Sequence, residues 1–213
     1  MLATTSLLLY GLPFLYQGQE IGMTNCRRED IAEYDDISTK DQYQEALMAG
    51  CTEEKAMEAC MENSRDNART PMQWNAGPGA GFTDGTPWLA LNPNYTKINV
   101  EEQERRSDSV LSYYKALIAL KKNPEYKETL TYGRFVPDFE ERDTIFAFHR
   151  ISDENGQDIF MAANYGKERQ TLPLSGGRAK VLLSNMGREE ERMEEIRRTG
   201  CLTLDSCESV VLL

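Results

Sequence analysis

The chain has 213 residues, of which 40% are hydrophobic and 28% are charged. This is the composition of an ordinary soluble globular protein, with enough apolar side chains for one large or two small cores. Its 24 Lys and Arg residues stand against 35 Asp and Glu, a net charge of −11. That excess opposes attraction to phosphate backbones and anionic lipid, so we expect neither nucleic acid nor a membrane as partner.

The amino terminus predicts a short apolar helix over residues 1–10, ended by Gly11 and Pro13. It lacks the basic region of a signal peptide and is too short to span a bilayer. The helix has no capping residue before it, so we expect the chain to enter in mid-helix. Residues 14–16 (Phe-Leu-Tyr) then predict a buried strand that runs into the polar loop Gln17–Glu20. A helix, turn and strand in this order are typical of parallel sheets and barrels.

Two short helices are predicted after an irregular stretch at 24–38. Ser38 is expected to cap the first, which stops at Gly50, and Thr52 begins the second, which runs to about Glu62. Residues 63–100 hold both tryptophans and four of the eight prolines, with little periodicity. A long irregular segment with this aromatic content indicates a functional loop.

Asp108 is expected to open an amphipathic helix that ends at Asn123-Pro124. The periodicity then changes to that of strands, which predicts a small antiparallel β-sandwich. Asn155-Gly156 is a hairpin signal between two of these strands, and the mixed-charge run 188–198 indicates a solvated hairpin or loop. The expected strands are Thr129–Phe135, Thr144–Ile151, Asp158–Ala163, Gln170–Leu174, Ala179–Leu183, Cys201–Leu204 and Ser209–Leu213.

The residue types that bind metals or activate nucleophiles are few. His149 is the only histidine, within a predicted strand, and is expected to face outward. No metal site, nucleophile elbow or phosphate-binding loop is predicted, and no cofactor is expected. The cysteines are odd in number and lack a C-x-x-C pair, which favours buried free thiols in a reducing cytoplasm over the alternative disulfides. They are Cys26, Cys51, Cys60, Cys201 and Cys207, with Cys51/Cys60 and Cys201/Cys207 as the alternative pairs.

One string stands out, Ser-Arg-Asp-Asn-Ala-Arg-Thr-Pro-Met-Gln-Trp at 64–74. Arg65 and Arg69 could aim planar donor forks at vicinal sugar hydroxyls while Pro71 holds Thr70 extended and Trp74 packs beneath. Alternatively, the two arginines pair with nearby carboxylates and fix a loop. Physical chemistry alone favours that second interpretation.

The same string, with Pro-Phe-Leu-Tyr-Gln-Gly-Gln-Glu-Ile-Gly-Met-Thr-Asn at 13–25, closely resembles the oligo-1,6-glucosidase and α-glucosidase group of the α-amylase family. The resemblance covers nearly the whole chain and is firmest over residues 1–122. It implies the C-terminal part of a (β/α)₈ catalytic barrel at 1–122, with Gln17–Glu20 and the 63–75 loop on the rim of the site, and an antiparallel β domain at 123–213.

The family's three catalytic carboxylates belong to barrel strands that would precede residue 1, so none is carried over. Arg65 and Arg69 match substrate-contacting arginines, Arg69 at the non-reducing glucose and Arg65 at the neighbouring sugar. The resemblance thus implies part of a retaining α-glucosidase acting on small α-glucosides, inactive without its N-terminal barrel portion. The alternative is a non-catalytic protein that binds carbohydrate or a partner.

The sequence departs from the family in two places near the leaving sugar. Gln19 stands where the family has the second-last Glu of Y-Q-G-E-E, and Asp35 and Ser38 replace the Arg and final Glu of E-Y-R-D-I-E. These changes remove a cation and a carboxylate, which puts a preference for the α-1,6 linkage in doubt.

Overall fold

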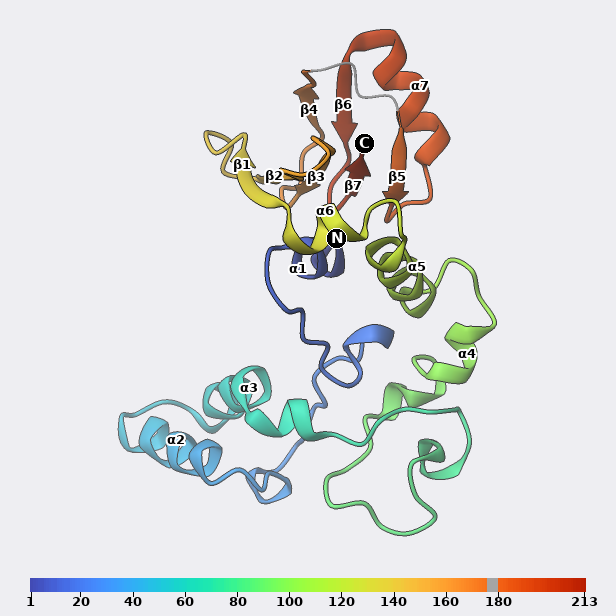
Figure 1. The fold of residues 1–213 in the computed structure, drawn as a ribbon. Coiled ribbons are helices and arrows are strands. Elements are labelled where there is room, and N and C mark those ends of the chain that lie inside the picture. The colour runs from blue at the N-terminus through green and yellow to red at the C-terminus, as the bar shows by residue number, and fades with distance from the viewer. Residues whose placement is uncertain (176–179) are drawn as a thin grey trace. The chain divides into compact units, whose positions relative to one another are not determined.

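The structure, a computed structural model, describes residues 1–175 and 180–213 and divides into two compact units (Figure 1). Met1–Phe14 joins Tyr113–Leu213 in the first unit, and Leu15–Ser112 forms the second. The expected division at residue 122 follows the family's domains rather than these units and stays a prediction.

The first unit is built on a five-stranded antiparallel sheet in the order β1-β2-β3-β7-β5. A two-stranded antiparallel sheet, β4 with β6, completes its β structure. The bounds are β1 Arg134–Asp138, β2 Ile145–Ile151, β3 Asp158–Asn164, β4 Gln170–Pro173, β5 Val181–Ser184, β6 Cys201–Leu204 and β7 Ser209–Leu212.

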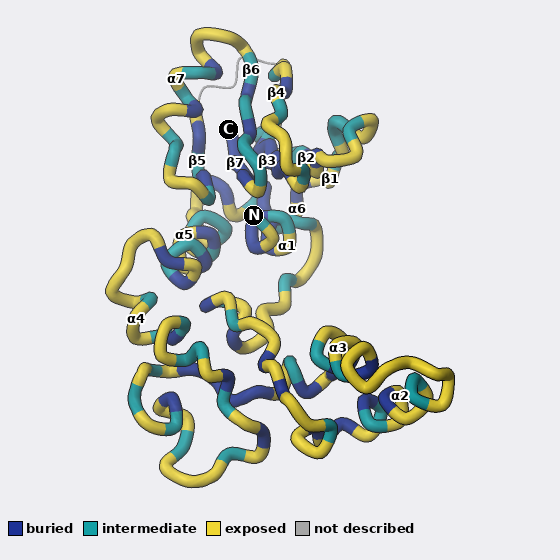
Figure 2. Tube along the Cα trace, turned by 180° about the vertical axis from the view of Figure 1, so that it is seen from behind, coloured by how far each residue is buried: buried dark blue, intermediate teal, exposed yellow. Residues whose placement is uncertain are grey.

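Alternate residues of the central strands supply two separate cores. One face of the larger sheet carries Phe148, Ile159 and Met161 and packs against helices α1 (Leu2–Leu8), α5 (Val110–Lys122) and α6 (Lys127–Tyr132). The other face meets the smaller sheet and helix α7 (Glu189–Thr199) in a second cluster. The central strands are dark blue in Figure 2 because both of their faces are covered. The prediction of an antiparallel β region is thereby confirmed.

The hairpin between β2 and β3 confirms the signal at Asn155-Gly156. Gly156 has a φ of 72°, and the Ser152 and Gln157 backbones close the turn through a 2.9 Å N–H to O bond. Glycine adopts this left-handed conformation without strain. His149, two residues before the end of β2, lies between Asp138 and Asp158, with its Nε2 and Nδ1 at 3.2 and 2.9 Å from their carboxylates. Its side chain is only 16% exposed, so the outward orientation expected of it is wrong.

Arg150 is fully buried, although its side chain is charged. Its guanidinium donates to the carbonyl oxygens of Leu8, Leu130 and Gly133 at 2.8–3.1 Å. A cation at the carbonyl end of a helix is stabilised by the helix dipole, and here it joins the ends of α1 and α6 to β2. Burial lowers the pKa of Arg150 from its ordinary value.

The second unit is mainly irregular. It contains helices α2 (Ile37–Met48), α3 (Glu53–Asn63) and α4 (Val100–Glu104) and the first residues of α5. Helices α2 and α3 pack antiparallel around a small core that includes Tyr34 and Cys60. Five 3₁₀ turns lie in the loops before α2 and after α3, at Gln19–Ile21, Ile31–Glu33, Arg65–Arg69, Pro78–Gly81 and Pro93–Thr96.

The prediction for the start of α3 is confirmed, because the Thr52 hydroxyl accepts the Lys55 N–H. Helix α2 also ends before Gly50 as expected, and Gly50 has a φ of 87°. The N-terminal cap of α2 is a correction, since Asp36 and not Ser38 accepts the Thr39 N–H. At the start of α5, the hydroxyl of Ser109 accepts the Ser112 N–H, while the expected Asp108 is paired with Arg106.

Three predicted strands or loops are wrong. Residues 14–16 form no strand, because an extended segment needs neighbouring strands for its backbone hydrogen bonds. Thr129–Phe135 divides into the end of α6 and the start of β1, and 188–198 is mostly helix α7 instead of a loop. Of the predicted strand Ala179–Leu183, Ala179 lies outside the described residues and the rest is found within β5 and its approach.

All five cysteines are free thiols. Cys26 and Cys60 are buried as expected, but Cys51 and Cys207 are exposed and Cys201 is intermediate, which corrects the expectation of uniformly buried thiols. In the described part of the chain, no helix is long and apolar enough to cross a membrane.

Candidate functional site

The arginine loop, residues 64–74, begins where α3 ends. The Ser64 hydroxyl accepts the Asp66 N–H and starts the 3₁₀ turn Arg65–Arg69. Thr70 then has φ −60° and ψ 147°, the extended conformation that Pro71 was expected to impose. This places both arginines on one short turn, with Arg65 64% and Arg69 37% exposed along their side chains.

Two aspartates connect the arginine loop to the N-terminus of α2. Asp66 is fully buried and accepts the backbone N–H groups of Asp35 and Asp36 at 2.7 and 3.0 Å. Buried carboxylates need such donors, because leaving one unpaired costs several kcal/mol. Asp66 therefore fixes the residue 35–36 backbone beside the arginine turn.

Asp36 receives both arginines. One carboxylate oxygen is 2.8 Å from Arg65 Nη2, and Arg69 Nη1 lies 3.6 Å from the same oxygen. The other oxygen accepts from Arg65 Nε at 3.4 Å and from Thr39. Burial alone would raise the pKa of Asp36, but the hydrogen bonds from Thr39 and Arg65 outweigh burial and hold it below its ordinary value. Asp36 is thus an anion on which the two guanidinium groups converge.

Arg69 also approaches Asp66, with 3.3 Å between Nη1 and Oδ1. In the described residues, its Nη2 has no hydrogen-bond partner. One edge of the Arg69 fork is therefore held in place, while the side chain stays 37% exposed. The ion pairs expected from physical chemistry are present, and they leave donors free for a ligand.

A cavity of about 340 Å³ lies along the other side of the arginine loop. It is lined by residues 16–19 and 23–25 and, from the arginine loop and the end of α3, by Glu62, Ser64, Asn67, Ala68 and Thr70. The Tyr16 hydroxyl joins the walls by donating to the Ala68 carbonyl at 2.9 Å. The resemblance implied that Gln17–Glu20 and the arginine loop share a rim, and the structure places Gln17–Gln19 beside that loop.

Gly18 allows the chain to turn tightly within Gln17–Gln19. Its φ of 87° favours glycine, and a Cβ at this position would collide with the Met23 side chain. Beyond the loop, the buried Gln73 side chain donates to Asn94 and to the Ile98 carbonyl. These contacts anchor the end of the arginine loop to the 92–100 segment.

Trp74 does not form the expected floor beneath the arginines. It is 48% exposed, and its backbone N–H donates to Ala80. The other tryptophan, Trp88, donates from Nε1 to the Asp35 carboxylate at 3.0 Å and is 67% exposed. The departure at Asp35 therefore holds an exposed aromatic ring, one residue before the aspartate that pairs with both arginines. No local pattern predicts this contact, because the two residues lie 53 positions apart.

Sequence reasoning also missed the roles of Asp36 and Asp66 as anchors. Asp66 lies within the conspicuous string, and its position between two arginines was the available signal. No spacing rule connects Asp36 to Arg65, since they lie 29 residues apart. Among the described residues, no group of histidine, cysteine or acidic side chains is arranged to hold a metal ion.

Comparison with known proteins assigns the family. The model of the α-amylase catalytic domain matches residues 1–133. The chain is 41% identical over 197 residues to probable oligo-1,6-glucosidase 2 of Bacillus subtilis, covering 89% of this chain and 34% of that one. Oligo-1,6-glucosidase of Bacillus cereus is 41% identical over 201 residues, which is 92% of this chain and 35% of that one. The chain belongs to the α-amylase family, in its oligo-1,6-glucosidase group.

Solved structures resemble the fold as a whole. The trehalose-6-phosphate hydrolase of Bacillus licheniformis superimposes with a TM-score of 0.86 at 33% identity, covering 99% of this chain and 37% of that one. The trehalulose synthase of Pseudomonas mesoacidophila gives 0.85 at 31% identity, with the same coverage. The chain spans about a third of the length of the curated relatives it matches.

Proposed function

We propose that this chain supplies the sugar-contacting arginine loop and the β domain of an α-glucosidase that acts on small α-glucosides or oligosaccharides. The observation that carries the proposal is the convergence of Arg65 and Arg69 on Asp36, with one edge of Arg69 left open. Planar guanidinium donors held in this way suit the vicinal hydroxyls of a sugar ring. Arg69 contacts the non-reducing glucose and Arg65 the neighbouring sugar.

The complete site belongs to a (β/α)₈ barrel followed by a β-sandwich, of which this chain provides the C-terminal portion. Retaining glycosidases use a nucleophilic carboxylate and an acid/base carboxylate about 5–5.5 Å apart. In this proposal those groups come from the N-terminal barrel portion, which is the chain's partner. The relatives' length supports this, since they extend well beyond the region that matches.

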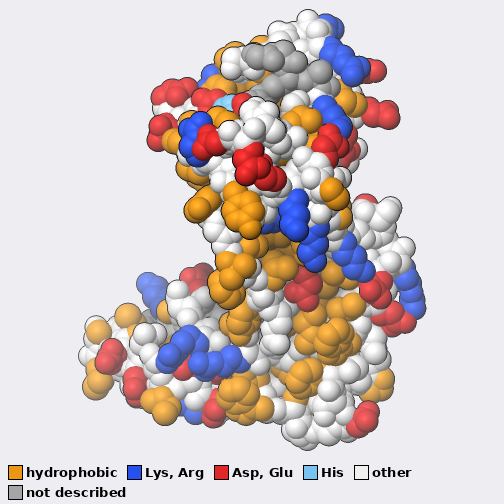
Figure 3. Space-filling model, in the orientation of Figure 1, with side chains coloured by type: hydrophobic (Ala, Val, Ile, Leu, Met, Phe, Trp, Pro, Cys, Tyr) orange, Lys and Arg blue, Asp and Glu red, His pale blue; other side chains and the backbone are white. Residues whose placement is uncertain are grey.

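Exposed apolar side chains near the start of the second unit also support a missing partner. Leu12 and Phe14 are 78% and 81% exposed, and Tyr16 is 55% exposed. Figure 3 shows hydrophobic side chains open at the surface along this segment, which Figure 1 draws after α1. Contiguous exposed apolar side chains mark surfaces that another polypeptide covers. In the complete enzyme, strands and helices of the barrel would pack against these side chains. We place that enzyme in the cytoplasm.

Complementation tests the proposal directly. The purified chain is mixed with the N-terminal two-thirds of the Bacillus cereus relative, and hydrolysis of an aryl α-glucoside is measured. We expect no turnover by either part alone and measurable turnover by the mixture. Turnover by the pure 213-residue chain would refute the assignment of the catalytic carboxylates to the partner.

A further inference from the structure

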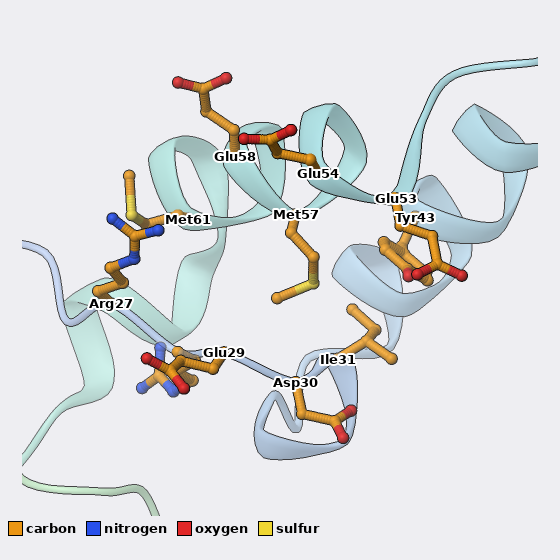
Figure 4. A pocket seen from close by; sticks show the side chains of 11 residues that line it. Arg27, Glu29, Asp30, Ile31, Tyr43, Glu53, Glu54, Met57, Glu58 and Met61 are labelled. Atoms are coloured by element: carbon orange, nitrogen blue, oxygen red, sulfur yellow. The ribbon is translucent and has the colours of Figure 1, made fainter.

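The second unit has a further cavity, of about 600 Å³, between the 27–31 loop and helices α2 and α3 (Figure 4). Figure 4 shows the carboxylates of Glu54 and Glu58 pointing away from this space. The guanidinium of Arg28 lies over the Tyr34 ring, and its nitrogens are fully buried. A ligand in this cavity could reach none of these three charged groups.

Trp88, in contrast, is an exposed aromatic side chain that is nevertheless fixed in place. It is 67% exposed, and its Nε1–H donates to Asp35 Oδ2 at 3.0 Å. Pro87 restricts the backbone before it, and Leu89 after it is only 3% exposed. A tryptophan whose own donor is satisfied at one edge keeps its ring faces for a ligand. Trp88 is thus anchored while most of its surface stays open.

Asp35 connects this ring to the arginine loop. Its backbone N–H donates to Asp66 at 2.7 Å. The next residue, Asp36, pairs with Arg65 Nη2 at 2.8 Å. The two-residue segment 35–36 therefore positions both the indole and an arginine to which the proposed function assigns a sugar.

This segment also leaves a donor and an acceptor available. Within the described residues, Asp35 Oδ1 accepts no hydrogen bond, and Arg65 Nη1 donates none while Nη2 and Nε are bonded to Asp36. Asp35 is exposed, and the Arg65 side chain is 64% exposed. Sugar hydroxyls suit such a pair of groups, because each hydroxyl can accept and donate.

The polar surroundings of Trp88 distinguish it from the apolar side chains that the barrel would cover. Leu12 and Phe14 stand among apolar residues in the sequence, whereas Trp88 is bonded to an exposed carboxylate. Covering that carboxylate with a polypeptide and no cation would be costly. A sugar avoids this cost, because its C–H groups meet the negative face of the ring while its hydroxyls keep hydrogen bonds.

The charges around the segment favour a neutral sugar. Three aspartates, at positions 35, 36 and 66, stand against two arginines, at 65 and 69, which leaves one negative charge in excess. Both arginines already pair with Asp36. A phosphate on the sugar would meet the exposed Asp35 carboxylate and be repelled.

We propose that Trp88 is the stacking surface for the second sugar of the substrate, a neutral sugar that leaves when the bond is cleaved. This inference rests on the function proposed above, in which Arg65 contacts that same sugar. Trp88 then determines how well a sugar leaving group is bound, whereas Arg69 acts on the non-reducing glucose.

The value of kcat/KM for three substrates of the complemented enzyme tests this inference. Isomaltose and maltose have a sugar as leaving group, whereas α-glucosyl fluoride has only fluoride, which cannot stack. We expect Trp88→Ala to lower kcat/KM for both disaccharides about fivefold, the loss of one aromatic contact. It should change the value for α-glucosyl fluoride less than twofold. Trp88→Phe, which keeps a ring, should retain at least half of the disaccharide activity.

Two further variants serve as controls. Tyr132→Ala removes an aromatic side chain of similar exposure, 73%, from the first unit and should change none of the three values. Arg69→Ala should lower kcat/KM for α-glucosyl fluoride as well as for the disaccharides. The two proposals can therefore fail separately.

Three results would overturn the role of Trp88. They are equal losses on all three substrates, which would indicate a structural role, a disaccharide kcat/KM of Trp88→Ala within twofold of the unsubstituted enzyme, and a preference for a disaccharide phosphorylated on its leaving sugar.

If the mixture shows no turnover, the proposed function fails and the chain alone decides the role of Trp88. The chain has two tryptophans, so Trp74→Phe leaves Trp88 as the only one. We then expect a saturable change in Trp88 fluorescence with isomaltose and none with sorbitol, an open-chain polyol without a ring face. The same response to both compounds, or a response to neither, would overturn the inference.

Discussion

At the scale of single residues, Asp36 is the group that organises the candidate site. It caps α2, accepts from Thr39, and receives both arginines of the loop. An aspartate in the helix cap and two cations around it would each be ordinary features alone. Their coincidence on one carboxylate means that helix α2 and the arginine turn are fixed by the same charge.

The pH dependence of stability follows from this arrangement. Because the pKa of Asp36 is lower in the folded chain than in the unfolded one, its contribution is fully present above about pH 4. It is lost as the pH falls through the folded pKa. We expect Asp36→Asn to lower the melting temperature at pH 7 and to have a smaller effect at pH 3. Thermal unfolding at the two pH values measures this, with the exposed Asp84→Asn as the control. Equal loss at both pH values would mean that the Asp36 charge is not what matters.

Arg150 stabilises the first unit by joining three backbone segments through its charged side chain. Replacing it with Met leaves the carbonyl groups of Leu8, Leu130 and Gly133 buried without their donor. At roughly 1–3 kcal/mol for an unsatisfied buried group, we expect the free energy of unfolding to fall by about 2–4 kcal/mol. The control is Arg134→Met, which removes an exposed ion pair with Asp153 worth about 0–1 kcal/mol. The shift in the midpoint of urea unfolding, followed by circular dichroism, is compared between the two variants. Equal shifts would show that the buried contacts of Arg150 add no more stability than an exposed ion pair.

At the scale of elements, α7 is held to the β structure by a buried ion pair. Arg192 of α7 bonds both oxygens of Glu208, Nε to Oε1 at 3.0 Å and Nη2 to Oε2 at 2.6 Å. The two residues are 5% and 0% exposed, and the helix runs beside β5 in Figure 1. Hydrogen bonds of this kind compensate the desolvation of both charges, but only while both partners remain.

Removing one partner should therefore cost more than removing both. We expect Arg192→Met alone to destabilise the chain by about 3–5 kcal/mol, because Glu208 is then a buried charge without a cation. The double variant Arg192→Met with Glu208→Met should recover most of that loss. A double-mutant cycle from urea unfolding measures the coupling, and strictly additive losses would contradict it.

Helix α7 also shows where sequence reasoning stopped short. Its run of Glu and Arg residues carries only Met193 and Ile196 as apolar positions, so the hydrophobic stripe that predicts a helix is almost absent. The end signals were nevertheless present: three glutamates in the first turn, Arg197 and Arg198 in the last, and Gly200 in the left-handed conformation beyond it. Helix ends were more informative here than periodicity.

The opposite error occurred at residues 129–132. Two threonines, a leucine and a tyrosine favour a strand by propensity, yet they form the end of α6. Thr129 and Leu130 are buried there, and the Arg150 guanidinium donates a hydrogen bond to the Leu130 carbonyl of the same helix. Tertiary contacts from a strand twenty residues later decided the local conformation, and no local pattern could contain that information. The β2–β3 hairpin succeeded because its signal, Asn155-Gly156, is entirely local.

The candidate site was predictable to a similar degree. The string around Arg65 and Arg69 located the loop, and Pro71 set the conformation of Thr70. The ion pairs of Asp36 with the arginines and the contact between Asp35 and Trp88 depend on residues brought together by the fold of the second unit. A sequence shows which groups are available, whereas convergence on one carboxylate is a property of three dimensions.

At the scale of the whole molecule, Asp35 and Trp88 bear on which glucoside fits. Where the resemblance leads us to expect an arginine, Asp35 fixes an exposed indole by a 3.0 Å hydrogen bond. We expect Asp35→Arg in the complemented enzyme to change the ratio of kcat/KM for isomaltose to that for maltose by at least threefold, because it releases the indole and adds a cation. Glucose release from the two disaccharides measures this ratio. A ratio unchanged from that of the parent enzyme would show that Asp35 does not influence the linkage preference.

We propose that the arginine loop of this chain becomes half of a sugar-binding site when a barrel completes it. The most direct measurement is kcat/KM for an aryl α-glucoside in the complemented mixture, with and without Arg69→Ala. A charged hydrogen bond to the sugar is worth about 1.5–3 kcal/mol in the transition state, so we expect kcat/KM to fall about 10- to 150-fold. The control, Arg105→Ala, should leave it unchanged. An Arg69→Ala mixture as active as the unsubstituted one would contradict the account.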